Sequence, residues 1–259
     1  MKACLNKQSY LRNGYLHLKG FLDSSEIKQV LPLLITHHSN WCDDNRIFYE
    51  DKAINSYNLT GFDYLTEKEK DRLFSFICQE KVTAMVQELL GYEAYFLGTQ
   101  LFFDPYDEKQ NNYWHRDIQY GELSLQDQKS ILGAYNPLHF RFAMRDERGI
   151  ELVPGSHTRW DTPEEMKVRL EQEGHLSHEP LKTGQVIELK RGDLLIFSAF
   201  MIHRGLYGDD RLSLDLLYSD WSPDVSNFLQ NNCLPKKANL TKFEAPDMLI
   251  NSYSLQEQK

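Results

Sequence analysis

Six short runs of aromatic and aliphatic residues, separated by clusters of Gly, Pro and Asp, dominate the middle of the chain. They cover residues 95–103, 140–144, 150–153, 186–189, 194–200 and 211–218. Runs of this length and spacing are typical of the strands of an antiparallel sandwich or barrel. We therefore predict a mainly β core over residues 95–220, within a single domain that spans residues 1–259.

The first 94 residues show a different sequence pattern and are predicted to be rich in helix. Asp23 and Glu26 form a capping pair, and so do Thr66 and Glu69. Such pairs begin helices because each side chain accepts a hydrogen bond from a free backbone N–H group of the first turn. Gly91 supplies a stop at the end of this helical region.

One helix start interrupts the β core. Thr162-Pro163-Glu164-Glu165 combines a cap, a proline at the first helical position and a capping-box acid. We predict that residues 158–184 form an insertion of one helix and a loop. Because it carries few apolar residues, we expect a mobile lid over the pocket mouth, the alternative being a fixed helical decoration. Residues 221–259 are expected to form an irregular, polar C-terminal wrap.

Charge and cysteine content exclude several classes of protein. Lysine and arginine total 29 against 38 aspartate and glutamate residues, a net charge of −9, which disfavours binding to nucleic acid. The longest uncharged stretch near the middle, 194–202, is much shorter than the about 20 residues of a membrane span. The four cysteines form no CxxC pair, so neither a zinc site nor a disulfide framework is indicated. We expect a cytoplasmic protein that binds neither membrane nor nucleic acid; the sequence makes no prediction of oligomeric state.

Three motifs could carry chemistry. In His115-Arg116-Asp117, an extended backbone would place the imidazole and the carboxylate on one side. With a third ligand they would form the two-histidine-one-carboxylate set that suits Fe(II), but a surface His beside an Asp is equally compatible with the motif alone. His203 ends an apolar strand, where a lone histidine is more often a core residue. The strand from Arg211 alternates in polarity, so its polar face either meets solvent or lines a barrel interior.

Taken together, these motifs resemble a known family. WHRD at 114–117, ELVPGSH at 151–157, RGDLLIFSAFMIHRG at 191–205 and then Arg211 are similar in order and spacing to the phytanoyl-CoA dioxygenase family. The resemblance implies a double-stranded β-helix, a jelly-roll or cupin-like fold, with flanking helices. It implies that His115, Asp117 and His203 bind Fe(II), and that Arg211 binds the distal carboxylate of the cosubstrate 2-oxoglutarate.

Other residues are candidates for the cosubstrate site. Ser213 shares the polar face of its strand with Arg211 and would donate one more hydrogen bond. Members of the family often carry a lysine at the end of the strand before the His-x-Asp motif, where this chain has Asp104. The candidates to replace that lysine are Gln100, Thr99 and Tyr113.

The substrate is predicted from the alternation in residues 139–145. If Phe140 and Phe142 pack against helices outside the barrel, Arg141 faces inward beside the iron, and Arg145 on the same face of the strand is a further candidate. A buried arginine needs an anionic partner, which would make the substrate a carboxylate or similar anion. The alternative is that the arginines face solvent and the phenylalanines fill the barrel. Trp114 could wall the pocket, although simple packing also explains it.

The reaction implied by the resemblance uses O2 and 2-oxoglutarate to hydroxylate a C–H bond of a small organic substrate, with succinate and CO2 as co-products. Two alternatives stay open: a metal-binding jelly roll that is not an oxygenase, such as an isomerase or sugar binder, and a non-catalytic relative. Arg211 with Ser213 argues against the first, and the intact His115, Asp117 and His203 set argues against the second.

Overall fold

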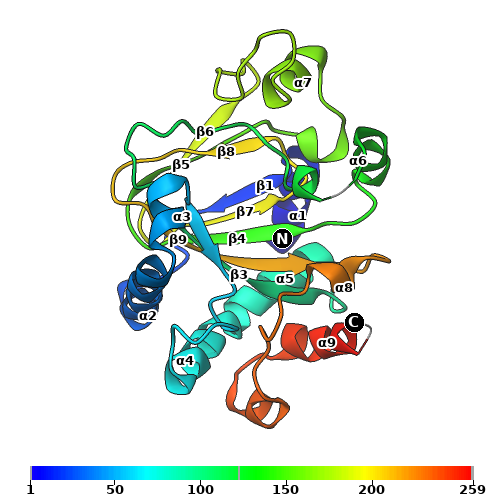
Figure 1. The fold of residues 1–259 in the computed structure, drawn as a ribbon. Helices are drawn as coiled ribbons and strands as arrows, with labels where there is room; N and C mark the ends of the chain where they lie inside the picture. The colour runs from blue at the N-terminus through cyan, green and yellow to red at the C-terminus, as the bar shows by residue number, and fades with distance from the viewer. Residues whose placement is uncertain (1, 122, 258–259) are drawn as a thin grey trace.

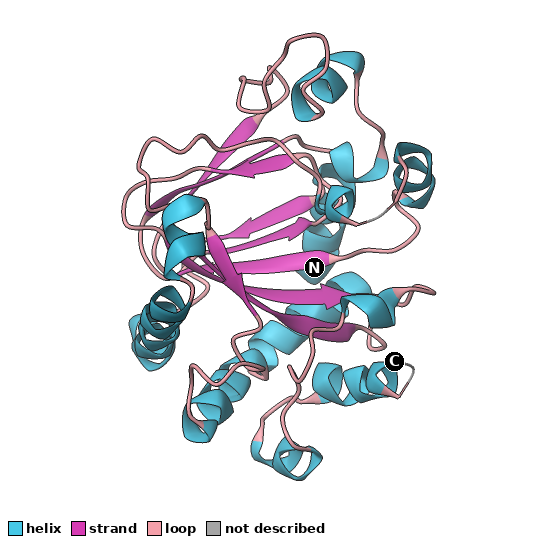
Figure 2. Ribbon diagram, in the orientation of Figure 1, coloured by secondary structure: helices cyan, strands magenta, loops and turns pink. Residues whose placement is uncertain are grey.

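The computed structural model of the protein describes residues 2–121 and 123–257, and its centre is a pair of antiparallel sheets (Figures 1 and 2). The larger sheet has the strand order β1-β7-β4-β9-β3-β2 and the smaller sheet the order β6-β5-β8. The strands are β1 (Tyr15–Leu18), β2 (Asn55–Tyr57), β3 (Tyr95–Phe103), β4 (Leu138–Ala143), β5 (Glu147–Leu152), β6 (Gln185–Leu189), β7 (Leu194–Ser198), β8 (His203–Gly205) and β9 (Leu212–Ser219).

All six predicted strand regions are strands, namely β3 to β7 and β9. Strands β1, β2 and β8 were not predicted, and each has four residues or fewer. These short strands are held by their neighbours: β1 pairs with β7, β2 with β3, and β8 with β5. Two pieces of the helix-rich N-terminal part thus complete the edges of the larger sheet.

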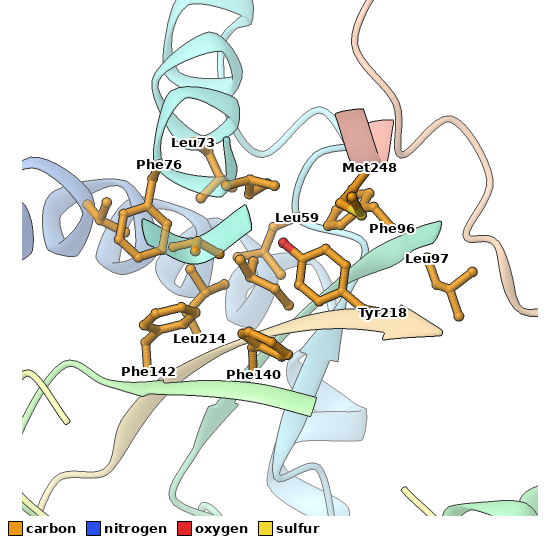
Figure 3. Close-up of a cluster of buried hydrophobic side chains, with 14 of the residues drawn as sticks. Leu59, Leu73, Phe76, Phe96, Leu97, Phe140, Phe142, Leu214, Tyr218 and Met248 are labelled. Carbon is orange, nitrogen blue, oxygen red and sulfur yellow. The ribbon is translucent and has the colours of Figure 1, made fainter. Parts of the chain in front are cut away.

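Helices cover the outer face of the larger sheet. Phe140 and Phe142 of β4 and Leu214 of β9 pack with Leu73 and Phe76 of the helix above them (Figure 3). The aromatic side of residues 139–145 therefore faces the helices, and the other side faces the interior between the sheets. The α-helices are α1 (Lys2–Asn13), α2 (Ser24–Asp44), α3 (Arg46–Asp51), α4 (Glu67–Ile77), α5 (Glu80–Leu90), α6 (Leu125–Ile131), α7 (Pro163–Arg169), α8 (Val225–Phe228) and α9 (Asp247–Gln256).

The predicted helix starts are confirmed. Asp23, Thr66 and Thr162 each cap a helix, and each cap forms a complete capping box with the acid three residues later. Gly91, with φ of 90°, ends α5. No helix within residues 2–121 and 123–257 is long and apolar enough to cross a membrane.

The C-terminal part differs from the irregular segment that was expected. It contains α8, the 3-10 helix η3 (Lys237–Lys242) and α9. Met248, Leu249 and Leu255 of α9 are buried in the main hydrophobic core, and α9 packs on β3. These apolar residues are spaced on one face of a short helix, within a composition that is otherwise polar, so the segment is a folded part of the core.

The insertion at residues 158–184 packs as the helical decoration that was the alternative to a lid. Val168 and Leu181 are buried with Trp114, and no residue of the insertion lines either cavity described below. The Asp161 carboxylate lies 2.7 Å from the guanidinium groups of both Arg116 and Arg169, and all three side chains are inaccessible to solvent. Two buried ion pairs and an apolar cluster hold this segment against the core. The mobile lid was expected because the segment contains few apolar residues.

Candidate metal centre and adjoining cavity

His115, Asp117 and His203 meet between the two sheets. One ligand atom from each lies within 4.8 Å of the other two. The Nε2 atoms of His115 and His203 are both 3.5 Å from Oδ1 of Asp117. Two imidazole nitrogens and one carboxylate oxygen at this spacing are the donor set of a facial site for a divalent transition metal.

The backbone fixes this meeting. His115 and His203 exchange two N–H to O=C hydrogen bonds, both of 2.9 Å, which add residue 115 beside β8 in the smaller sheet. The N–H group of Asp117 donates to the carbonyl of Ala199 at 3.1 Å, as the chain turns into the 3-10 helix η1 (Asp117–Tyr120). The extended conformation around residue 116 places the His115 and Asp117 side chains together, as expected from the two-residue period.

Each histidine is held in the tautomer that a metal needs. Nδ1 of His115 lies 3.1 Å from the carbonyl of Tyr113, and Nδ1 of His203 lies 3.0 Å from the carbonyl of Met201. A proton on Nδ1 that is donated to a carbonyl leaves the lone pair of Nε2 free for a metal. Burial lowers the pKa of His115 and lowers that of His203 to about 3, so both rings stay neutral.

A second histidine layer holds Asp117. Nε2 of His139 lies 2.7 Å from Oδ2 of Asp117, and its Nδ1 lies 2.9 Å from Oδ2 of Asp215. Arg141 donates two hydrogen bonds of 2.7 Å to Asp215. Burial disfavours the charged imidazole, but the two carboxylates outweigh it and raise the pKa of His139 to about 9. Burial also opposes the charge of Asp117, yet the surrounding histidines, His203 foremost, lower its pKa.

A cavity of about 360 Å³, which we call the polar chamber, opens beside these residues. Arg211 lines it with a side chain that is almost wholly buried, and none of its three guanidinium nitrogens makes a hydrogen bond within the described residues. The carboxylate of Glu147 is its ion-pair partner, with 3.4 Å between Nε and Oε2. Phe102 stacks against it at 5.3 Å from the ring centroid. Other lining residues are Asn55, Tyr113, Tyr120, Arg141 and Tyr207.

Small local features position Arg211. The Asp104 carboxylate accepts hydrogen bonds from the N–H groups of Gly208 (2.7 Å) and Arg211 (3.0 Å), which fixes the loop before β9. A side chain at Gly205 would bring its Cβ within 2.8 Å of Nη1 of Arg211, so the guanidinium would have to move away from its present position. The aspartate found where relatives often have a lysine thus holds the backbone of the arginine loop.

Of the residues predicted to bind the cosubstrate, some line the polar chamber and others do not. Gln100 and Tyr113 line the polar chamber. Thr99 does not, because its side chain points to the opposite face of β3 and accepts a hydrogen bond from the N–H group of Leu59. Ser213 is also corrected: its hydroxyl donates to Oε1 of Glu147 at 2.8 Å, and the residue lies outside the chamber wall.

Two predictions about substrate contacts are corrected as well. Trp114 is fully buried under the insertion, where its Nε1 donates to the carbonyl of Glu179, and it lines neither cavity. It points away because it alternates with His115 along the extended chain. Arg141 does face inward, but Asp215 already satisfies its guanidinium, so no anionic substrate is required. Arg145 lies at the surface beside Asp210.

Sequence reasoning missed three residues of the site: His139, Asp215 and Glu147. The first two could have been found in the alternation, since His139 shares the inward face of its strand with Arg141, and Asp215 shares that of Arg211. The direct register of Arg141 opposite Asp215 between β4 and β9 brings them together. Glu147 carried no signal of its own, because a lone glutamate at a strand start is ordinarily exposed.

The chain matches a model of the phytanoyl-CoA dioxygenase (PhyH) family over residues 10–206. No match is found among curated proteins. Similar solved structures include the non-heme alpha-ketoglutarate-dependent epimerase SnoN from nogalamycin biosynthesis, at 18% identity and a TM-score of 0.55, covering 85% of this chain and 83% of that one. The carbocyclase SnoK from nogalamycin biosynthesis has 15% identity and a TM-score of 0.52, with 83% of each chain covered.

A third similar structure is EctD from S. alaskensis with 2-oxoglutarate and 5-hydroxyectoine. Its identity is 15% and its TM-score 0.55, and the match covers 83% of this chain and 74% of that one. At these identities the similarity establishes a shared fold, and the named reactions belong to those proteins.

Proposed function

This chain belongs to the phytanoyl-CoA dioxygenase family, and from that premise we propose that it is an Fe(II)- and 2-oxoglutarate-dependent dioxygenase that hydroxylates a small organic molecule. The observation that carries the proposal is the position of Arg211. A buried guanidinium without hydrogen bonds lines the same chamber as His115, Asp117 and His203. A buried charge of this kind calls for an anionic ligand.

Iron suits the donor set. The two neutral imidazoles and the ionised carboxylate match the preference of Fe(II) for nitrogen and oxygen ligands, and a three-residue set leaves positions open. His115, Asp117 and His203 would hold the ion. The arrangement of His139 and Asp215 behind Asp117 is the kind of outer layer that orients a metal-bound carboxylate.

The chamber also suits 2-oxoglutarate. Arg211 would bind its distal carboxylate through the planar fork of the guanidinium, and Phe102 would support the stacked guanidinium. Gln100 and Tyr113 line the chamber and would add hydrogen bonds. Ser213 would act through Glu147, by holding the carboxylate that neighbours Arg211.

When bound, iron and 2-oxoglutarate supply the oxidative chemistry, in which O2 and 2-oxoglutarate give succinate, CO2 and one hydroxylated C–H bond of the substrate. The chain itself contributes position and exclusion of water. His139 fixes the Asp117 carboxylate, the tyrosines at 113, 120 and 207 wall the chamber, and Arg211 orients the anion. We infer that the two facing sheets form a double-stranded β-helix and that residues 1–259 act as one domain.

The test is succinate formation by the purified chain with Fe(II), 2-oxoglutarate and O2. We expect slow, substrate-independent turnover that His203→Ala abolishes and His175→Ala, outside the site, leaves unchanged. Titration with Ni(II) should show one site that the His203→Ala variant lacks. Unimpaired metal binding in His203→Ala would contradict the proposal. Once a substrate is found, the gain of one oxygen atom distinguishes hydroxylation from epimerisation or ring closure.

A further inference from the structure

A second cavity of about 310 Å³ lies on the far side of Asp117. We call it the apolar chamber. It shares Gln100, Asp117 and His139 with the polar chamber, so the two cavities meet at the candidate metal centre. A molecule in the apolar chamber would therefore lie beside the metal ligands without occupying the place of Arg211.

The walls of this chamber are hydrophobic. Strands β3, β4 and β9, the turn after β7 and the segments around α6 and α8 supply them, and in Figure 1 α6 and α8 lie at the right-hand ends of the sheets. No lysine or arginine from the described parts of the chain lines it. Its main apolar residues are Leu97, Ile118, Tyr135, Leu138, Phe200 and Leu217.

Two polar atoms in the chamber lack partners. The Ser219 hydroxyl, in a residue only 1% exposed, makes no hydrogen bond to any described residue, and neither does Oε1 of Gln100. Gln230 differs, because its amide is already bonded to both backbone groups of Thr99. Buried polar atoms ordinarily find a partner, so the Ser219 hydroxyl is free for a ligand.

The charges point to a neutral ligand. An anion here would lose its hydration with no cationic side chain to replace it, and it would face the Asp117 carboxylate. Arg141, which lines the polar chamber, already donates from Nε and Nη2 to Asp215. A largely apolar pocket with a few convergent polar groups is typical of sites for small neutral molecules.

We propose that the apolar chamber binds the substrate, and that this substrate is a neutral, mostly apolar small molecule with one hydroxyl or carbonyl oxygen, which hydrogen-bonds to Ser219. The proposal rests on the proposed function, since it places a C–H bond of that molecule beside Asp117. Leu123 and Phe228 line the chamber and are 42% and 52% exposed, so the entrance is apolar as well.

Matched probes test the charge preference directly. The full chain, loaded with Ni(II) so that no turnover occurs, is titrated with cyclohexanol and adamantanol and with the corresponding ring carboxylates, and binding is followed by NMR. We expect each alcohol to bind at least tenfold more tightly than its carboxylate. Ser219→Ala should weaken binding of the alcohols roughly 2- to 12-fold, the range for one net hydrogen bond.

A positive charge placed at the entrance of the apolar chamber tests whether the alcohols bind in this chamber. Phe228→Lys should narrow the preference for alcohol over carboxylate by at least threefold. The control Ile47→Lys, at an apolar residue on α3 that is 88% exposed and lines neither chamber, should leave it unchanged. Both substitutions are at exposed side chains, so folding is not at risk.

The outcomes separate the two proposals. The substrate assignment would be overturned, whatever the succinate assay shows, if carboxylates bind as tightly as alcohols or if alcohols do not bind at all. It would also be overturned if neither Ser219→Ala nor Phe228→Lys changes the affinities. Alcohol binding with the expected variant effects, but no succinate formation under Fe(II) and O2, would uphold the chamber as a binding site and overturn the oxygenase function.

Discussion

Nε2 of His139 lies 2.7 Å from Oδ2 of Asp117, while Oδ1 of the same carboxylate faces both His115 and His203. The two oxygens therefore have different partners, and the carboxylate cannot rotate without losing its hydrogen bond to His139. This relationship makes His139 a positioning residue for the candidate metal centre, although it offers no ligand atom to the metal.

We expect His139→Ala to weaken metal binding about 10- to 100-fold, because outer residues that orient a metal ligand contribute on this scale. His139→Gln should recover part of the loss, since its amide can donate to Asp117. Co(II) titration, read from its absorption spectrum, measures the affinity without turnover. The control is His175→Ala, and equal affinity in His139→Ala and the parent chain would contradict the positioning role.

Arg211→Ala should reduce the affinity for 2-oxoglutarate roughly 30- to 1,000-fold, the consequence of losing a bidentate charge-assisted pair in a buried site. Arg211→Lys should restore only part of it, because an ammonium group lacks the planar fork. Calorimetry with the Ni(II)-loaded chain gives both affinities. Arg148→Ala, at an exposed arginine of β5, serves as the control. An Arg211→Ala chain that is folded and binds 2-oxoglutarate normally would exclude this anchor.

The insertion should depend on Asp161 for its stability. Asp161→Asn leaves two buried guanidinium groups, those of Arg116 and Arg169, facing each other without a counter-charge. Breaking a buried ion pair costs about 3–5 kcal/mol, or on the order of 10 °C in Tm for a chain of this size. Calorimetric melting measures the change, and Asp146→Asn, in an exposed pair with Lys190, should melt with the parent. Identical Tm values for the two variants would show that the pairs do not anchor the segment.

Stability should fall on acidification because of His37. This side chain is buried, and burial, with a smaller repulsion from His38, lowers its pKa from 6.5 to about 4. The unfolded chain binds a proton on His37 more readily than the folded chain does. The free energy of unfolding is therefore unaffected by this group above pH 6.5 and decreases as the pH falls from 6.5 toward 4. From pH 7 to pH 5 the loss is about 2 kcal/mol.

Urea unfolding of the parent and of His37→Gln at both pH values isolates this contribution. The variant should lose about 2 kcal/mol less between pH 7 and pH 5 than the parent does. A parental pH dependence in His37→Gln would assign the effect to other groups.

The sequence alone predicted the long strands, several helix starts and the main candidate residues. Capping pairs such as Asp23 with Glu26 predicted helix starts because the signal is complete within one turn. The six strand regions were visible in short apolar runs. The motif around His115 and Asp117, with His203 and Arg211, identified the family because several patterns agreed in order and spacing.

Which face of each strand points inward, and which partner each buried charge has, depend on how distant segments pack. Alternation in residues 139–145 showed that Arg141 and Phe142 lie on opposite faces, yet either face could have been the inner one. The helices that pack on Phe142 settled it. His139 meets Asp215 across 76 residues of sequence, and the same Asp215 carboxylate accepts two hydrogen bonds from Arg141. A pattern of period two fixes relative faces, whereas partners and cavities depend on strand register and on packing between distant segments.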